Sequence, residues 1–497
     1  MRTVLINPPL VLQRGDFLGS GIPYMPHGLA YLAAALKRHG FGVLVVDLFG
    51  EDPFSGTRMG AAVLQGKGVS AALKGECRDA DAVFIYARSV MEFDALVEII
   101  RFLRRDGVKA SIIVFENAQA VIGGALSLAS RELFDAGCEY LIVGDPEEAA
   151  VELLGSIREK RGIGPIRGVI ARDAKTGAES EQRGAIADLD TLQYPAWEEF
   201  PLENYWRLSY AHGPMSGRYL ALLTSRGCPY RCAFCAVPQT NRGVWRARSP
   251  ENVVGEMAEF QVRFGVSEFH WEDLNPTVDR MRVAGICEGM IRRGLEVTWK
   301  LVSGTKIETL DEGTIRLMAR AGCRYISFSP ESGSPRVLKA MEKTFDFAHG
   351  LAMTRVMRTI GIRSQACFVI GFPRETAEDR EDSAVYAREL VSAGVDELAF
   401  FIMTPIPGAP AYGTLQWYDS LSQLSFSPAW RKDFKTLSRW RRAHYLRFLF
   451  VKTIRSPHRV LRQCANFLRR RFETKMEMTP YRAIHQWRIW RRAAARG

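Results

Sequence analysis

Three cysteines stand close together in the segment CPYRCAFC at residues 228–235, with the spacing Cys-x3-Cys-x2-Cys. Thiolates grouped in this way select an iron–sulfur cluster or zinc. A structural zinc site would need a fourth ligand at short spacing, and residues 236–248 contain neither Cys nor His. Cys228, Cys232 and Cys235 therefore predict a 4Fe-4S cluster held by three thiolates, with one iron open to a substrate.

The remaining six of the nine cysteines do not form a second group of this kind. They stand alone among apolar neighbours, and we interpret them as small core residues. The N-terminal sequence MRTVLINPPL lacks the basic head and cleavage site of a signal peptide. Since no apolar run approaches the roughly 18 residues of a membrane span, we expect a cytoplasmic protein.

The elements that would position the cysteines fall into two series of alternating strands and helices. With 497 residues, 47% of them hydrophobic, the chain is long enough for two to four globular domains. Strands are predicted at 3–7, 41–48, 82–87, 109–116 and 139–145, with helices at 27–39, 92–105 and 125–136. This alternation predicts a doubly wound parallel sheet, a Rossmann-like domain over residues 1–155.

The alternation resumes after a bridging segment at 156–215. Strands are predicted at 219–225, 268–273, 297–303, 324–332, 364–372 and 397–405, and the cysteines follow the first of them. Six such units predict a partial (β/α)6 barrel of the TIM type over 216–415, whose working residues lie at the carboxyl ends of the strands. A basic helical region is expected over 416–497.

A cysteine triplet after the first strand of a partial barrel resembles the radical S-adenosylmethionine (SAM) superfamily. Four further segments resemble motifs of that family in the same order: Glu272-Asp273, SPESGS at 329–334, FVIGFPRET at 368–376 and TPIPG at 404–408. In that family the open iron binds the amino and carboxylate groups of SAM. The resemblance implies SAM-binding roles for Phe234, Glu272, Asp273, Glu331, Ser332, Ile370 and Gly371.

The first domain is similar to the cobalamin-binding subclass of this superfamily. The turn Asn7-Pro8-Pro9 and the segment PHGLAYLA at 26–33 are typical of it, and the resemblance covers about residues 1–415. No Asp-x-His-x-x-G motif is present to ligate cobalt, and the usual Gly-Gly loop after the fourth strand is replaced by FENAQ at 115–119. The resemblance implies cobalamin contacts at Asn7, Ser89, Glu116 and Asn117.

The implied activity is cleavage of SAM to a 5′-deoxyadenosyl radical and cobalamin-dependent C-methylation of an unactivated carbon in a biosynthetic intermediate. The implied partners are a small-molecule or lipid-like substrate and an electron donor of the flavodoxin or ferredoxin type. Ring contraction, cyclisation or rearrangement is the alternative within the subclass. A non-catalytic cobalamin or iron–sulfur sensor is the alternative of another class.

The basic charge of the chain is concentrated at its end. Residues 431–497 hold 20 Lys and Arg against three acidic residues, a net charge of +17, so the rest of the chain carries −5 of the total +12. Arg alternates with Trp, Phe and Leu at roughly helical spacing there. This pattern favours either helices packed on the acidic barrel or a peripheral contact with an anionic membrane, and it lacks any recognised nucleic-acid-binding module.

Overall fold

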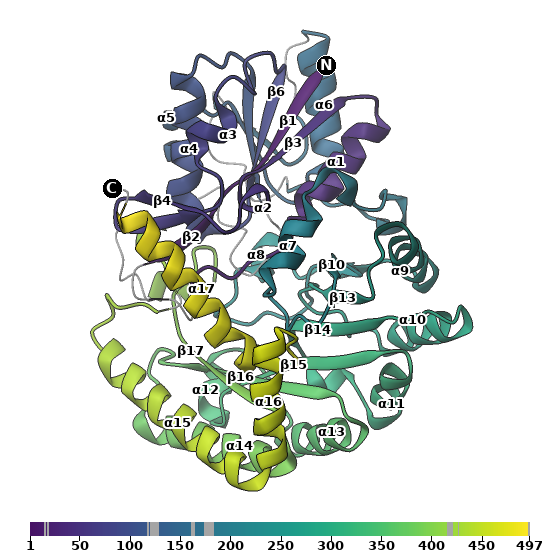
Figure 1. Ribbon diagram of the computed structural model, residues 1–497, viewed down its shortest axis with the longest axis vertical. Coiled ribbons are helices and arrows are strands. Elements are labelled where there is room, and N and C mark those ends of the chain that lie inside the picture. The colour runs from purple at the N-terminus through teal and green to yellow at the C-terminus, as the bar shows by residue number, and fades with distance from the viewer. Residues whose placement is uncertain are drawn as a thin grey trace.

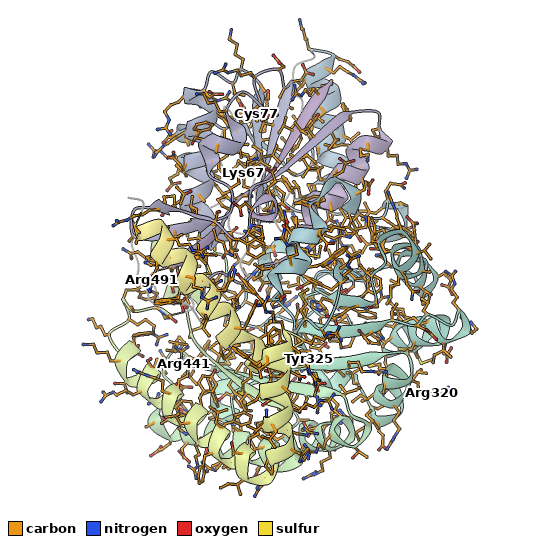
Figure 2. All side chains as sticks on the ribbon, in the orientation of Figure 1. Lys67, Cys77, Arg320, Tyr325, Arg441 and Arg491 are labelled. Atoms are coloured by element: carbon orange, nitrogen blue, oxygen red, sulfur yellow. The ribbon has the colours of Figure 1, made fainter. Side chains whose placement is uncertain are left out.

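The computed structural model describes residues 1–13, 16, 19–116, 119, 129–160, 165–172, 183–414, 421–425 and 427–495. These residues form two six-stranded sheets flanked by helices, one sheet in each half of the chain (Figure 1). Lys67 and Cys77 lie in the first half and Tyr325 in the second (Figure 2). Two small antiparallel sheets accompany the large ones.

The first large sheet has the order β3-β1-β6-β7-β8-β9. Its strands are β1 (Arg2–Asn7), β3 (Gly42–Asp47), β6 (Ala82–Ala87), β7 (Ser111–Glu116), β8 (Tyr140–Ile142) and β9 (Val169–Ala171). All pairs are parallel except β8 with β9. The five predicted strands are confirmed, and β1 lies between β3 and β6, where the strand order reverses. Ligands of such sheets bind beyond the carboxyl ends of the strands at this point.

Helices cover both faces of the first sheet. Leu5 of β1 packs in one cluster with α1 (His27–Arg38) and α6 (Glu147–Arg158), whereas Val4 and Ile6 pack in the other. That second cluster includes α3 (Val69–Leu73), α4 (Phe93–Arg105) and α5 (Ser130–Ala136). Alternate residues of one strand thus bury into opposite layers, which is why these strands are continuous apolar runs.

Three features of this half differ from the prediction. The boundary after residue 155 falls inside α6, and β9, which lies in the predicted bridging segment, extends the first sheet. A small sheet, β2-β5-β4, formed by Leu10–Gln13, Ala62–Gln65 and Gly56–Met59, was not expected. The helix predicted at 125–136 is observed from Ser130, and its first residues lie outside the described ones. Short, weakly patterned strands such as β9 acquire their structure from pairing that the local sequence does not encode.

The second large sheet is parallel and its strands follow chain order, β10-β13-β14-β15-β16-β17. They comprise β10 (Tyr219–Leu222), β13 (Glu268–Trp271), β14 (Thr298–Thr305), β15 (Cys323–Glu331), β16 (Arg363–Ile370) and β17 (Glu397–Ile402). Helices α9 (Pro250–Phe264), α10 (Arg280–Arg292), α11 (Glu312–Arg320), α13 (Phe347–Ile360) and α14 (Ala377–Ala393) alternate with them. All six predicted strands are observed.

Helix starts follow ordinary capping chemistry. Ser249 accepts from the amide of Asn252, with Pro250 in the first turn. Thr376 and Asp379 form a reciprocal capping box at the start of α14. The shorter helices α2 (Leu48–Glu51), α7 (Leu202–Leu208), α8 (Val237–Thr240) and α12 (Pro335–Ala340) connect the larger elements.

The C-terminal region consists of α15 (Phe434–Arg455), α16 (Pro457–Arg469) and α17 (Lys475–Ala495), which pack on one side of the molecule (Figure 1). The residues at the start of α17 are hydrogen-bonded to the second half of the chain. The Phe472 amide donates to Met215 O, before β10, at 2.7 Å, and the Met476 amide donates to Glu397 Oε2, on β17, at 2.6 Å. The far end of α17 reaches the small sheet of the first half, where Ile489 packs with Leu12 and Val63.

The interpretation of helices packed on the barrel is therefore confirmed for α17. None of the helices in the described ranges has the length and apolarity to cross a bilayer.

Replacing Phe472 with Ala tests how firmly this region is anchored. Phe472 is fully buried in the main core, so the loss should cost about 3–5 kcal/mol and lower the melting temperature by several degrees in a thermal unfolding scan. Leu468→Ala is the matched control, because Leu468 is 81% exposed four residues earlier. Equal melting temperatures for the two variants would contradict the anchoring described here.

Candidate functional site

The cysteine loop follows β11 (Ser225–Arg226), which pairs antiparallel with β12 (Arg246–Ala247) and so closes the loop at its base. The loop is held at its centre as well. Ala233 donates its amide to Met341 O at 2.9 Å, after α12, and accepts at its carbonyl from the Ala411 amide at 2.8 Å, after β17. Gly227, with φ of +85°, permits the entry into the loop, because a Cβ there would lie 2.1 Å from Val244 O.

The three thiols are half-buried and lie close enough together to affect one another's pKa. Burial raises the pKa of Cys228 and Cys232, against the positive charges of Lys343 and Lys306, and raises the pKa of Cys235 to about 12. Within the described residues, no three Cys, His, Asp or Glu side chains are gathered closely enough to bind a metal ion. The fit to an iron–sulfur cluster therefore rests on the donor set, three soft thiols on one anchored loop.

At the end of β15, Glu331 lies close to the cysteine loop. It is buried and has φ of +65°, a conformation that non-glycine residues rarely adopt and that is frequent at functional sites. Lys343 donates to its Oε1 at 2.8 Å, and the charges of Glu331 and Lys343 both act on Cys232. Ser332, fully buried, accepts from the Ser334 amide at 3.1 Å. Strand β15 thus ends in a fixed turn beside the thiols.

Glu272 and Asp273, which end β13, have different surroundings. Asp273 accepts from the Thr224 amide at 2.9 Å and from Ser225 Oγ at 2.7 Å, so its carboxylate fixes the segment that leads into the cysteine loop. Glu272 pairs with His212 Nδ1 at 2.6 Å. Burial would raise the pKa of Glu272, but His212 outweighs it and lowers the pKa below the usual value.

Gly371, immediately after Ile370 and β16, is held from both sides. Its amide donates to Glu375 Oε2 at 2.6 Å, and its carbonyl accepts from Arg431 Nη2 at 2.9 Å. Arg431, almost fully buried, also donates to Met403 O at 2.5 Å and so joins the ends of β16 and β17. With φ of +75° and a Cβ position 2.5 Å from Leu437 Cδ1, no other residue fits at Gly371 without rearrangement.

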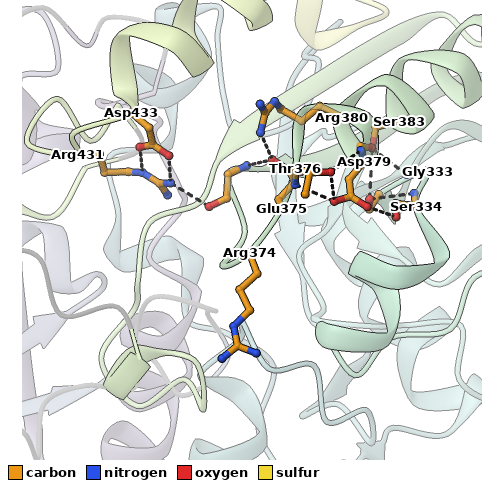
Figure 3. A network of polar contacts seen from close by, with 12 residues as sticks. Gly333, Ser334, Arg374, Glu375, Thr376, Asp379, Arg380, Ser383, Arg431 and Asp433 are labelled. Carbon is orange, nitrogen blue, oxygen red and sulfur yellow. Dashed lines mark hydrogen bonds and ion pairs between the residues drawn. The ribbon is translucent and has the colours of Figure 1, made fainter.

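This network extends from Arg431 to β15 (Figure 3). Arg431 pairs with Asp433 on one side of the turn. On the other side, Asp379 accepts from the Thr376 amide at 2.7 Å and from Ser334 Oγ at 2.6 Å. Burial raises the pKa of Glu375 to about 7. The turns after β15, β16 and β17 are therefore one connected unit.

Phe234 joins the cysteine loop to that unit. It packs against a small apolar cluster that includes Ala233, Met341, Phe372 and Met403, drawn from the loop, α12 and the ends of β16 and β17. Of the residues that the sequence singled out in the second half, Glu331 lies close enough to Cys232 for its charge to act on the thiol. Phe234 packs in the small apolar cluster, and Ile370 is fully buried in the main core.

In the first half, the predicted residues lie at the carboxyl edge of the sheet and contact protein groups. Asn7 donates to Asp47 Oδ1 at 2.6 Å and accepts from Arg88 at 3.3 Å. Ser89 accepts from the Met91 amide at 3.2 Å. Glu116 accepts from the Gly144 amide at 2.9 Å and pairs with Arg183; Asn117 lies outside the described residues.

Asp145, which follows β8, links this edge to the cysteine loop. Arg226 pairs with Asp145 at 3.0 Å and with Glu147 at 2.7 Å, and Arg246 pairs with Asp145 at 2.5 Å. All four side chains are largely buried. Arg226 and Arg246 are also opposite each other in the backbone pairing of β11 with β12, at the base of the cysteine loop. The carboxyl edge of the first sheet therefore faces the cysteines. No sequence pattern singled out Asp145, so this contact was missed.

His27, at the start of α1, is a second residue that sequence reasoning did not single out. It is 5% exposed, and among the described residues neither ring nitrogen has a hydrogen-bond partner. Burial lowers the pKa of His27 to about 4, so the ring is neutral near pH 7, with one donor and one acceptor unused. Buried groups of this kind are ordinarily satisfied, so this orphaned pair fits a site that accepts a bound polar group between the two halves.

Comparison with known proteins agrees with this arrangement. Residues 222–387 match the family model of the radical SAM superfamily. The chain is 26% identical over 436 residues to an uncharacterized methyltransferase of Pyrococcus horikoshii, covering 87% of this chain and 86% of that protein. It is 26% identical over 444 residues to the cytidylyl-2-hydroxyethylphosphonate methyltransferase of Streptomyces wedmorensis, covering 82% and 80%.

Among solved structures, the fold is similar to that of the radical SAM methyltransferase TsrM from Kitasatospora setae, bound to cobalamin and a [4Fe-4S] cluster. The TM-score is 0.63 at 20% identity, over 83% of this chain and 77% of that one. The chain therefore contains a region that matches the radical SAM superfamily, within a fold similar to that of TsrM.

The Arg431 contacts predict a local effect. Arg431→Ala removes charge-assisted hydrogen bonds to two carbonyls, each worth about 1.5–3 kcal/mol, so amide exchange at 371–376 should accelerate about tenfold or more in hydrogen–deuterium exchange. Arg374→Ala in the same turn is the control, because the Arg374 side chain is exposed and points away from the network (Figure 3). An equal acceleration of amide exchange in both variants would show that the Arg431 hydrogen bonds do not hold this turn.

Proposed function

We propose that the protein is a cobalamin-dependent radical SAM C-methyltransferase that acts on an unactivated carbon of a small or lipid-like biosynthetic intermediate. The observation that carries this proposal is the set of ion pairs from Arg226 and Arg246 to Asp145. They turn the ligand-binding edge of the first sheet toward the cysteine loop of the second. A methyl carrier and a radical source would have to face one another in this way.

In this proposal Cys228, Cys232 and Cys235 hold the 4Fe-4S cluster. Glu331 and Lys343 form a charged pair beside it that suits the amino and carboxylate groups of SAM. Phe234 and the Gly371 turn offer an apolar and a backbone surface for the adenine. Asp273 acts indirectly, by holding the segment before the loop.

Cobalamin would occupy the edge formed by Asn7, Ser89 and His27. When bound, the cluster and SAM supply a radical able to abstract hydrogen from an unactivated carbon, and cobalamin supplies the methyl group. The protein orients the groups and excludes water from the space between them. The domains then comprise a cobalamin-binding fold that runs from residue 1 through β9, a partial (β/α)6 barrel over 216–415 and the helical region over 416–497. An electron donor of the flavodoxin or ferredoxin type is the partner.

The test is anaerobic reconstitution with iron, sulfide and hydroxocobalamin, followed by SAM and a reductant. We expect 5′-deoxyadenosine by mass spectrometry and cobalamin bound in a one-to-one ratio. S-adenosylhomocysteine formed alongside would favour methyl transfer over ring formation or rearrangement. Deoxyadenosine without bound cobalamin would rule out the methyltransferase, and neither signal from protein with an intact cluster would favour a sensor.

Cysteine variants provide the control for this experiment. The triple variant C228A, C232A, C235A should lose iron, sulfide and deoxyadenosine formation, because no other described cysteines lie on that loop. Cys464→Ala should retain all three, since Cys464 is exposed on α16. Iron retained in full by the triple variant would contradict the assignment of the ligands.

Glu331→Gln tests the SAM contact separately. Removing the carboxylate that opposes Lys343 should weaken SAM binding about tenfold with iron content unchanged, measured by equilibrium dialysis with labelled SAM. Glu308→Gln is matched, because Glu308 also pairs with a lysine of this region, Lys306, at 3.2 Å. Wild-type SAM affinity in the Glu331 variant would remove that residue from the site.

A further inference from the structure

The C-terminal helices expose large apolar side chains on the side that faces away from the core. On α15 these are Leu446, Leu449, Phe450 and Ile454, from 44% to 68% exposed. Leu449 and Phe450 follow Leu446 by three and four residues, and Ile454 follows Phe450 by four, which puts all four side chains on one broad face of the helix. Because Leu437, Phe448 and Lys452 are the buried residues of α15, this face lies opposite the core-facing side.

Helix α16 continues the exposed apolar surface. It packs beside α15 and buries none of its described residues, yet Leu461 and Leu468 are 71% and 81% exposed. These two residues are seven apart and so share one face of the helix. We call the six side chains Leu446, Leu449, Phe450, Ile454, Leu461 and Leu468 the apolar ridge.

Exposed cations without an acidic partner among the described residues accompany the apolar ridge. Arg439 and Arg442 are exposed and donate to carbonyls of their own helix, Lys435 O and Ser438 O. No acidic partner of Arg447 is recorded in the described part of the chain either. Part of the net charge of +17 over residues 431–497 is therefore displayed on the outer side of α15.

We propose that the apolar ridge and its arginines bind the surface of an anionic lipid bilayer. Apolar side chains enter the boundary between headgroups and acyl chains, while Arg contacts the lipid phosphates, which is how interfacial helices bind. A nucleic acid would use the arginines but would leave six large aliphatic and aromatic side chains in water. The charge complementarity and the apolar ridge together select the bilayer.

The helices are held to the enzyme in a way that fits this role. Tyr445 Oη accepts from the Phe400 amide at 2.9 Å, and Lys452 donates to Asp396 O at 2.7 Å. The inner side of α15 is thus fixed to the middle of β17 and to the residue that precedes this strand. The binding surface is a rigid part of the protein and need not fold on contact.

The test is sedimentation of the full-length, cluster-reconstituted protein with vesicles of equal parts phosphatidylglycerol and phosphatidylcholine, and with phosphatidylcholine alone. We expect binding to the anionic vesicles and a large loss on raising the salt concentration. The double variant L446S, F450S should bind at least about tenfold more weakly. Arg439→Gln with Arg442→Gln should also weaken binding to anionic vesicles.

The matched control is V262S with M281S, which removes two exposed apolar side chains, 87% and 77% exposed, from α9 and α10. This control should bind vesicles as the wild type does. Because all substituted side chains are exposed, melting temperature and iron content should be unchanged in every variant.

Three results would overturn the proposal. The wild type could fail to sediment with either vesicle, or L446S, F450S could bind as tightly as the control. Alternatively, the wild type could form a dimer by sedimentation velocity that L446S, F450S abolishes, without vesicle binding, which would make the apolar ridge a contact between copies of the chain. The proposal does not depend on which reaction the enzyme catalyses.

Discussion

The buried ion pairs around Asp145 are the interaction on which the relation between the two sheets depends. Arg226 and Arg246 stand opposite each other in the β11–β12 pair, and both reach the same carboxylate. Desolvating these charges is costly, and the cost is recovered only while every partner is present. The arrangement therefore favours one orientation of the first domain over the cysteine loop, since any other would leave two arginines unpaired.

A second set of contacts makes the strand ends of the second sheet act together. Asp379 caps α14 while accepting from Ser334, and Arg431 joins the carbonyls of Gly371 and Met403. The turns after β15, β16 and β17 consequently cannot move independently. A site built on them is preorganised by these hydrogen bonds, some of which join a side chain to a backbone carbonyl or amide.

The sequence was informative where the signal is local. Continuous apolar runs located the strands of both large sheets, and the cysteine spacing located the loop, because burial and ligand chemistry both leave their mark within a few residues. Asp145, His27 and Arg431 were not recognised as site residues. The partners of Asp145 are Arg226 and Arg246, and that of Arg431 is Gly371, all far away along the chain, and no periodicity records such pairs. His27 was missed because its burial without a partner among the described residues is visible only in the folded chain. The strand β9 was missed for the same reason, since it is only three residues long and is defined by its pairing with β8.

The net positive charge of the C-terminal region combines arginines that have two different roles. Arg431 is 4% exposed and serves the strand ends, and Arg459 pairs with Asp396, whereas Arg439 and Arg442 lie in solvent beside exposed leucines. A single count of positive charge cannot separate these groups, and neither can helical periodicity, because α15 is apolar on both of its sides. Burial separates them: the inner side, with Leu437 and Phe448, is explained by packing on the second sheet, while the outer side has no such explanation. An exposed apolar stripe lowers the solubility of the isolated chain and does not stabilise its fold. Its presence next to arginines that have no acidic partner among the described residues therefore calls for a partner that is both apolar and anionic.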